Sequence, residues 1–337
     1  MAVVLAYAAI YLIWGSTFLA IRIAVGSIPP LFMMGVRCIA AGSLLVAWAT
    51  LRGDRVSLRT WGHASLAGAL MFGCAYGALA WAEQRIPSGV AALVVATLPL
   101  WVTTIEWAQR GRRPSARALI GVAIGFGGVA LLVLGGTGAP LALLPVAVVA
   151  LGEGAWAIGS LYARPPRLPN AVALNAGMPL LTGGVLLVFS SWATRELASF
   201  HLRDVSTASV AALAYLVIFG SIVAFSAYAW LMQVSAPWRV GTHAYVNPLI
   251  AVALGAAVAG EPVTLALVAS AVVIVGSVAL ILGGTAGHGS EAARSEGEGA
   301  AWHAVEPRRA AIGSVRPVVT ARRAVSSLRE TRQPGPA

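Results

Sequence analysis

The sequence predicts an all-α integral membrane protein with ten transmembrane helices in two inverted five-helix repeats. Three observations lead to this fold class: charges are scarce, ten long apolar segments follow one another, and the second half repeats the pattern of the first. Of the 337 residues, 58% are hydrophobic and 10% are charged, and the mean hydropathy is +0.82. Soluble domains carry about 25% charged residues, so most of this protein's surface must face lipid.

Each of the ten apolar segments is long enough to cross a bilayer, whose hydrocarbon core of about 30 Å requires about 20 helical residues. Their apolar character is continuous and does not alternate, which predicts helices rather than the strands of a barrel. The expected spans are residues 3–25, 30–51, 61–81, 88–107, 118–134, 141–162, 171–192, 207–232, 240–259 and 263–282.

The repeat is visible as a sequence match at an offset of 149 residues. The segment AWAEQ at 80–84 matches AWLMQ at 229–233, and the run GGVAL from Gly127 matches GSVAL from Gly276. Each half holds an odd number of spans, so the copies must lie upside down to one another, as in alternating-access transporters. The predicted repeats are residues 1–136 and 137–284.

The arginines predict the orientation. The sequence contains no lysine, and its net charge of +11 comes from arginines in short loops and in the C-terminal tail, which is the positive-inside pattern rather than a nucleic-acid signal. With both termini cytoplasmic, ten loop arginines lie inside and four outside. The inside set is Arg52, Arg55, Arg59, Arg110, Arg112, Arg113, Arg117, Arg164, Arg167 and Arg239, and the outside set is Arg22, Arg85, Arg195 and Arg203. We expect a multi-pass protein of the inner (plasma) membrane.

Residues 285–337 are rich in arginine and have no apolar periodicity, which predicts a disordered cytoplasmic tail. The tail is either a solvated segment without a role in transport or a basic segment attracted to anionic lipid. Cys38 and Cys74 both fall in apolar runs and suit small buried residues. No Cys/His spacing is typical of a metal site, so we expect no metal and no cofactor.

The chain resembles the EamA-type transporters of the drug/metabolite transporter superfamily. The matching motifs are WGSTF from Trp14, Pro29–Pro30 followed by Arg37, Pro99, Asn247 with Pro248, and GEP from Gly260. The resemblance covers residues 5–284. It implies two EamA domains in an inverted arrangement, a central cavity lined mainly by spans 1, 3, 4, 6, 8 and 9, and movement of metabolites, often export of amino acids or related compounds.

Charged residues inside spans are the first candidates for function, because each costs about 2.5–3.5 kcal/mol at a helix centre. Glu153 lies near the middle of span six and is either a proton- or substrate-binding group or a protonated structural one. Arg37 in span two either binds a substrate carboxylate, pairs with Glu153, or is structural. Arg22 near the end of span one can extend to the interface. Glu83 is expected at the interface, and Glu261 is expected to cap span ten.

Aromatic and proline residues complete the candidate set. Trp14, Trp156, Tyr76 and Tyr245 are expected to face the cavity and to hold an amphipathic or cationic substrate, whereas Trp81 suits the cavity and the interfacial belt equally well. Asn247 belongs to the span-nine motif. Pro99 and Pro248 occupy matching positions in spans four and nine, where they act either as hinges or as plain kinks.

The sequence therefore predicts a transporter, not an enzyme, that exports small organic metabolites, amino-acid-like or cationic-amphipathic, by alternating access. The chain has no Walker A motif, so a proton gradient acting through Glu153 is one energy source and uncoupled facilitated diffusion is another. A membrane scaffold acting through the basic tail is the alternative from another class. The expected partners are a small-molecule substrate, the lipid bilayer and protons, with no nucleic acid, in a monomer or a homodimer.

Overall fold

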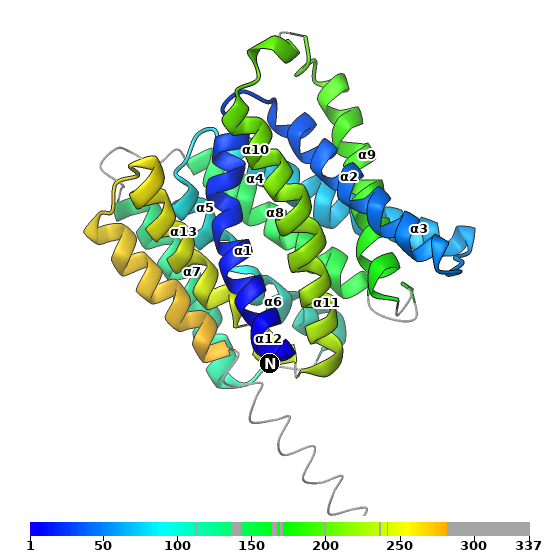
Figure 1. Ribbon diagram of the computed structural model, residues 1–337. Coiled ribbons are helices and arrows are strands. Elements are labelled where there is room, and N and C mark those ends of the chain that lie inside the picture. The colour runs from blue at the N-terminus through cyan, green and yellow to red at the C-terminus, as the bar shows by residue number, and fades with distance from the viewer. Residues whose placement is uncertain are drawn as a thin grey trace, which may run out of the picture. The chain divides into compact units, whose positions relative to one another are not determined.

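The computed structural model describes residues 1–111, 114–135, 143–163, 167–168, 171–198, 200–235, 237–240 and 242–281. The predicted tail, residues 285–337, and three of the loop arginines, Arg112, Arg113 and Arg164, lie outside these described residues. The described helices belong to one compact unit, Met1–His288. Within the described ranges every regular element is a helix, as Figure 1 shows.

The helices follow in the order of the predicted spans. They are α1 (Ala2–Ala24), α2 (Pro30–Leu51), α3 (Leu58–Gly68), the π-helical η1 (Ala69–Tyr76), α4 (Gly77–Ala82), α5 (Ser88–Val95), α6 (Leu98–Arg110), α7 (Ala116–Gly135), α8 (Leu143–Tyr162), α9 (Val172–Ala193), the 3₁₀ turn η2 (Leu202–Asp204), α10 (Thr207–Tyr215), the π-helical η3 (Leu216–Val223), α11 (Ala224–Val234), α12 (Pro237–Val240), α13 (His243–Ala259) and a last helix, Leu265–Ile281.

Seven of the described helical segments are long and apolar enough to cross a membrane, and three further apolar helices are shorter. The three shorter ones are Ala116–Leu132, His243–Ala259 and Leu265–Ile281. All ten expected segments coincide with these helices, with ends that agree within about three residues. The all-α membrane class is therefore confirmed, whereas ten crossings and an inverted repeat stay predictions.

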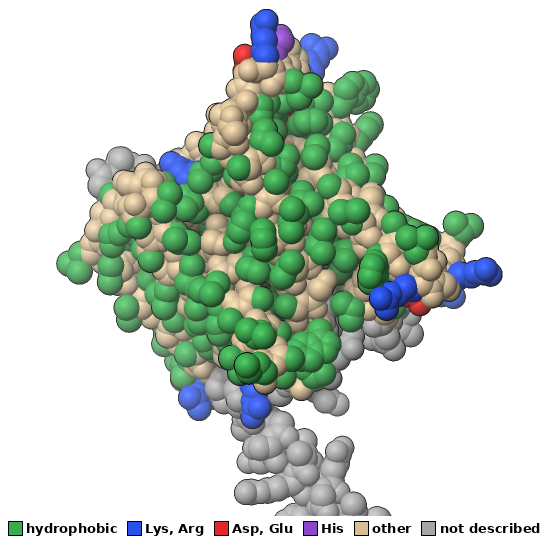
Figure 2. Space-filling view, viewed as in Figure 1, with side chains coloured by type: hydrophobic (Ala, Val, Ile, Leu, Met, Phe, Trp, Pro, Cys, Tyr) green, Lys and Arg blue, Asp and Glu red, His purple; other side chains and the backbone are tan. Residues whose placement is uncertain are grey.

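The surface of the helical unit is apolar, as a lipid-facing surface must be. Figure 2 shows hydrophobic side chains over much of one face, with arginines at its margins. Large side chains such as Trp48, Leu151 and Phe189 are more than half exposed. A soluble protein rarely leaves so continuous an apolar surface open to water, so these side chains are lipid contacts.

The first helix of each half of the chain packs against helices of the other half. Helix α1 lies against α10, α11 and α13, and α8 lies against η1, α4 and α6. The first span of each half thus packs on the third and fourth spans of the other half. The most extensive pairing joins α2 to α9, the second span of each half.

Glycines allow α2 and α9 to approach closely. A Cβ atom on Gly42 of α2 would lie 2.5 Å from the backbone nitrogen of Leu181 and 2.8 Å from the carbonyl oxygen of Gly177, both in α9. Close backbone approach through small residues is a common way for helices to associate in lipid, where the hydrophobic effect offers little.

We expect Gly42→Ala to destabilise the protein by about 1–3 kcal/mol, because the added methyl meets backbone atoms that cannot rotate away and α2 and α9 must separate. Thermal unfolding in detergent measures the effect. Gly127→Ala in α7 is the matched control. A Cβ there meets nothing within 4 Å, and helix propensity favours alanine by up to about 1 kcal/mol. Equal melting temperatures for the two variants would contradict the close contact.

Candidate functional site

Two π-helical segments occur at corresponding places in the two halves, η1 in the third span and η3 in the eighth. π-Helical turns are rare and are often found at functional sites, because the wider turn shifts side chains and backbone groups away from the regular pattern. In η3, the carbonyl oxygen of Gly220 accepts a hydrogen bond from Trp14 Nε1 at 3.2 Å. The hydroxyl of the next residue, Ser221, accepts a hydrogen bond from Arg37 Nε at 2.9 Å. Segment η3 thus brings together side chains from α1 and α2.

A cluster of aromatic rings lies between these segments. Trp14 contacts Phe225, Tyr228 and His243 with ring centroids 5.1–5.4 Å apart. Tyr76 and Trp156 stack at 5.4 Å with 21° between their planes. We call the whole set the aromatic cluster; its members are Trp14, Phe72, Tyr76, Trp156, Phe225, Tyr228 and His243.

Arg37 is the charged group of this site. It is only 2% exposed, and its guanidinium lies over the ring of Tyr76, with 4.9 Å between Cζ and the ring centroid. A further, weak contact runs from Nη1 to the sulfur of Met34 at 3.5 Å. Among the described residues no carboxylate forms an ion pair with Arg37, although buried charges are normally paired.

Glu153 enters the same region from α8. It is 6% exposed and lies one turn before Trp156, so both side chains project to the same side of the helix. Its carboxyl interacts electrostatically with Tyr76. Among the described residues, no hydrogen bond or ion pair connects it to Arg37, so the direct Arg37–Glu153 pair, one alternative of the sequence analysis, is not formed. The charge of Glu153 nevertheless acts on Tyr76, whose ring lies under Arg37.

Three of the predicted residues lie outside the aromatic cluster. Trp81 is covered by Arg85, whose Cζ lies 4.0 Å from the ring centroid. Tyr245 donates through its hydroxyl to the carbonyl oxygen of Val278 at 3.1 Å. The Asn247 amide, in the orientation that satisfies its donors, contacts the carbonyl oxygens of His243 at 3.1 Å and Tyr11 at 3.2 Å. The last two contacts hold helices together.

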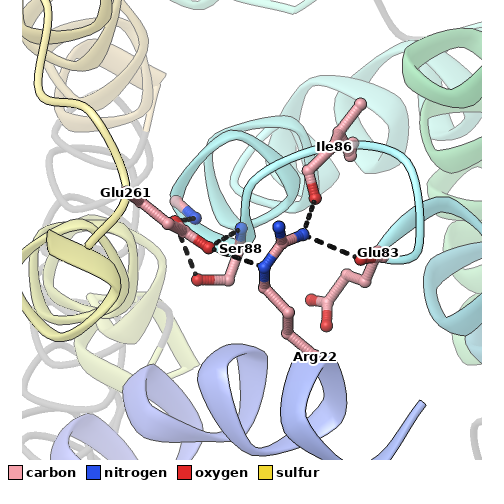
Figure 3. Close-up of polar contacts among 6 residues, drawn as sticks. Arg22, Glu83, Ile86, Ser88 and Glu261 are labelled. Atoms are coloured by element: carbon pink, nitrogen blue, oxygen red, sulfur yellow. Dashed lines mark hydrogen bonds and ion pairs between the residues drawn. The ribbon is translucent and has the colours of Figure 1, made fainter. Parts of the chain in front are cut away.

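Arg22 also lies apart from the aromatic cluster, at the end of α1 (Figure 3). Its Nε pairs with Glu261 Oε1 at 3.2 Å. Its Nη1 donates to the carbonyl oxygens of Glu83 at 3.0 Å and Ile86 at 2.8 Å. Arg22 therefore links α1 to the turn before α5 and to the segment after α13, and does not extend freely to the interface.

Two expectations about glutamates were wrong. Glu83 is completely buried rather than interfacial, and the guanidinium of Arg22 lies against the turn that carries it. Glu261 does not cap span ten. Its carboxylate accepts from the backbone nitrogens of Ser88 at 2.8 Å and Gly89 at 3.2 Å, and so caps α5. The last helix is capped instead by Thr264, whose hydroxyl accepts from the nitrogen of Leu267.

The two prolines occupy different local structures. The fourth span is broken after Val95, and Pro99 lies in the first turn of the new helix α6, where proline is well tolerated. Pro248 lies inside α13, which continues through it, and proline there cannot donate to the carbonyl four residues earlier. Neither arrangement by itself reports motion, so the hinge role stays a prediction.

Sequence reasoning missed Phe72, Tyr228 and Ser221. Phe72 lies one turn before Tyr76, so helical periodicity from that predicted residue was an available signal. Tyr228 lies three residues after Phe225, on the same side of α11. Ser221 had no such signal, because a serine in an apolar span is common and its contact with Arg37 depends on the packing of two distant spans.

An apolar helical bundle with a buried arginine and a buried carboxyl among aromatic rings defines a multi-pass membrane protein with an internal polar site. The model of the EamA-like transporter family matches residues 1–134 and 142–283. The chain belongs to this family, which confirms the resemblance to EamA-type members of the drug/metabolite transporter superfamily, and it is a membrane transporter.

Similar proteins fit this assignment. An uncharacterized inner membrane transporter, YedA of Escherichia coli strain K12, is 39% identical over 257 residues, which cover 75% of this chain and 81% of YedA. A protein of the same strain named as a probable amino-acid metabolite efflux pump is 21% identical over 76% of this chain and 86% of its own. A known crystal structure matches the fold with a TM-score of 0.57 and 21% identity, over 82% of this chain and 95% of the other.

Proposed function

We propose that this protein exports a small amphipathic metabolite that carries a carboxylate and an amino group, by alternating access, with Arg37 and Glu153 as its binding groups. The observation that carries the proposal is the buried guanidinium of Arg37, which has no acidic partner among the described residues. A charge at such a depth costs about 2.5–3.5 kcal/mol. One serine hydroxyl and one ring offset much of that cost, but neither carries the negative charge that normally pairs a buried cation. A substrate carboxylate would supply it.

The surroundings of Arg37 favour an amino-acid-like substrate over a simple anion. Glu153, whose charge acts on Tyr76, offers a carboxyl for an ammonium group. The rings of Tyr76 and Trp156 offer apolar and cation–π contact to a side chain. A similar protein is named as a probable amino-acid metabolite efflux pump, which agrees with this class. A carboxyl that binds either an ammonium or a proton also allows exchange of substrate against H⁺.

Alternating access suits the packing of the two halves. The first span of each half packs on the third and fourth spans of the other, as expected for two inverted five-helix repeats. The rings of the aromatic cluster are in mutual contact, so substrate entry requires them to separate. The break before Pro99 and the missing hydrogen bond at Pro248 within α13 are the proposed places of bending. We place both termini on the cytoplasmic side of the inner membrane, as the loop arginines predict.

Counterflow into proteoliposomes tests the proposal. Vesicles containing the purified protein are loaded with one unlabelled amino acid, and uptake of labelled amino acids, nucleosides and quaternary amines is measured with and without an imposed pH gradient. We expect counterflow of amino acids carrying apolar side chains, accelerated by the gradient. Exchange indifferent to the gradient would indicate an uncoupled facilitator. No movement of any compound by folded protein would contradict the proposal and favour a scaffold acting through the tail.

A further inference from the structure

The turn between α4 and α5 carries a carboxyl group that the proposed binding site does not use. Glu83, the first residue after the span Leu58–Ala82, is 0% exposed. Neither of its carboxyl oxygens has a hydrogen-bond partner among the described residues. Figure 3 shows the carboxyl beside the side chain of Arg22, with no interaction drawn to it. A buried carboxylate without donors is strongly unfavourable, so this arrangement suits the protonated, neutral form.

The charged groups around Glu83 come from three elements. Arg22 on α1 has the strongest electrostatic effect on Glu83, followed by Glu261 after α13 and Arg37 on α2. Burial raises the pKa of Glu83 well above its ordinary value, the two arginines oppose the shift, and Glu261 adds to it. Arg85, two residues further along the chain, donates to the carbonyl oxygen of Trp81 instead.

The guanidinium of Arg22 lies near two carboxyl groups but pairs with only one of them. It pairs with Glu261 through Nε, but it reaches only the backbone carbonyl of Glu83, not its carboxyl. Glu261 has other donors: the backbone nitrogens of Ser88 and Gly89 and the hydroxyl of Ser88 at 3.1 Å. Glu261 would therefore remain stabilised as a carboxylate without Arg22, whereas an ionised Glu83 would depend on that arginine.

We propose that Glu83 is a proton-binding site, and that loss of its proton draws Arg22 away from Glu261 to Glu83. The proton leaves to water past Arg22, whose side chain is 36% exposed. The exchange removes the link between α1 and the segment after α13, while Glu261 continues to cap α5. Proton binding at this site would thus favour the closed contact between the two halves at this end of the bundle. The role in coupling rests on the proposed transport function, but the proton site itself does not.

Infrared difference spectroscopy of the full-length protein in lipid tests the proton site. Spectra at acidic and alkaline pH are compared for the carbonyl band of a protonated carboxylic acid. We expect a titrating band in the wild type that is lost in Glu83→Gln and retained in Glu153→Gln. A band unchanged by Glu83→Gln, in protein shown to be folded by size exclusion and circular dichroism, would overturn the proposal.

The partner exchange has its own test in Glu261→Gln. This change removes the competing carboxylate but leaves an amide oxygen to accept from Ser88. Arg22 then has Glu83 as its acidic partner, and an adjacent cation lowers the proton affinity of a carboxyl about tenfold or more. We expect the titration midpoint of the Glu83 band to fall by at least about one pH unit, and an unchanged midpoint would refute the exchange. Since neither measurement needs substrate, failed counterflow with an intact Glu83 band would reject the transport proposal alone.

Discussion

Arg37→Met is expected to reduce transport about 10- to 100-fold while leaving the protein folded and about as stable as the wild type. A hydrogen bond from a buried charged group contributes about 1.5–3 kcal/mol, and each 1.4 kcal/mol corresponds to a factor of ten in affinity. Loss of the guanidinium should therefore appear as a higher substrate concentration for half-maximal counterflow. The assay is counterflow at several concentrations of labelled amino acid.

The stability of the same variant separates a binding role from a structural one. Removing the charge saves about 2.5–3.5 kcal/mol of burial cost. It forfeits the contact with Ser221 and a cation–π contact with Tyr76 of about 2 kcal/mol. These effects nearly cancel, so we expect a change within about 1 kcal/mol. A large drop in melting temperature with normal transport would show that Arg37 is structural.

Arg85→Met is the matched control for Arg37→Met. Arg85 also lies over an aromatic ring, that of Trp81, but it is exposed and outside the aromatic cluster. Its removal takes away the same charge and the same kind of ring contact, but outside the proposed binding site. We therefore expect unchanged counterflow. Arg37→Lys keeps the charge and loses the planar fork of donors, and it should retain part of the affinity.

Glu153→Gln is expected to abolish the accelerating effect of a pH gradient while leaving gradient-independent exchange measurable. With one proton exchanged per substrate, a lumen one pH unit more acidic than the outside drives about tenfold accumulation of substrate, since one pH unit corresponds to about 1.4 kcal/mol. Glutamine cannot release a proton, so the accumulation ratio should fall to about one. The measurement is the steady-state ratio of labelled substrate inside and outside the vesicles.

The conservative change Glu153→Asp shows whether the carboxyl itself matters. Aspartate keeps the titrating group on a shorter side chain, and we expect accumulation to recover in part. A wild-type accumulation ratio in Glu153→Gln would exclude this residue from coupling. If both Glu153→Gln and Glu83→Gln retained the response to the gradient, neither buried carboxyl would be the coupling site.

The class of the protein and the limits of its helices could be predicted from the sequence because they depend on local properties. A helix needs about 20 apolar residues to cross a bilayer, and whether a segment is long enough can be judged from that segment alone. The same local reasoning singled out Arg37 and Glu153 as candidates, since a charge within an apolar span is costly wherever its partners lie. The aromatic residues Trp14, Tyr76 and Trp156, which surround them, followed from the spans that carry them.

The contacts of these residues were decided only by the tertiary structure. Glu261 caps α5 across a separation of 173 residues, and Arg37 donates to Ser221 across 184. No local pattern predicts such pairs, because they depend on which helix faces pack together and on the shifted register of a π-helical segment. The burial of Glu83 has the same origin. A glutamate at the end of a span is predicted locally to be an interfacial group, and only the tertiary structure shows that Glu83 is completely buried.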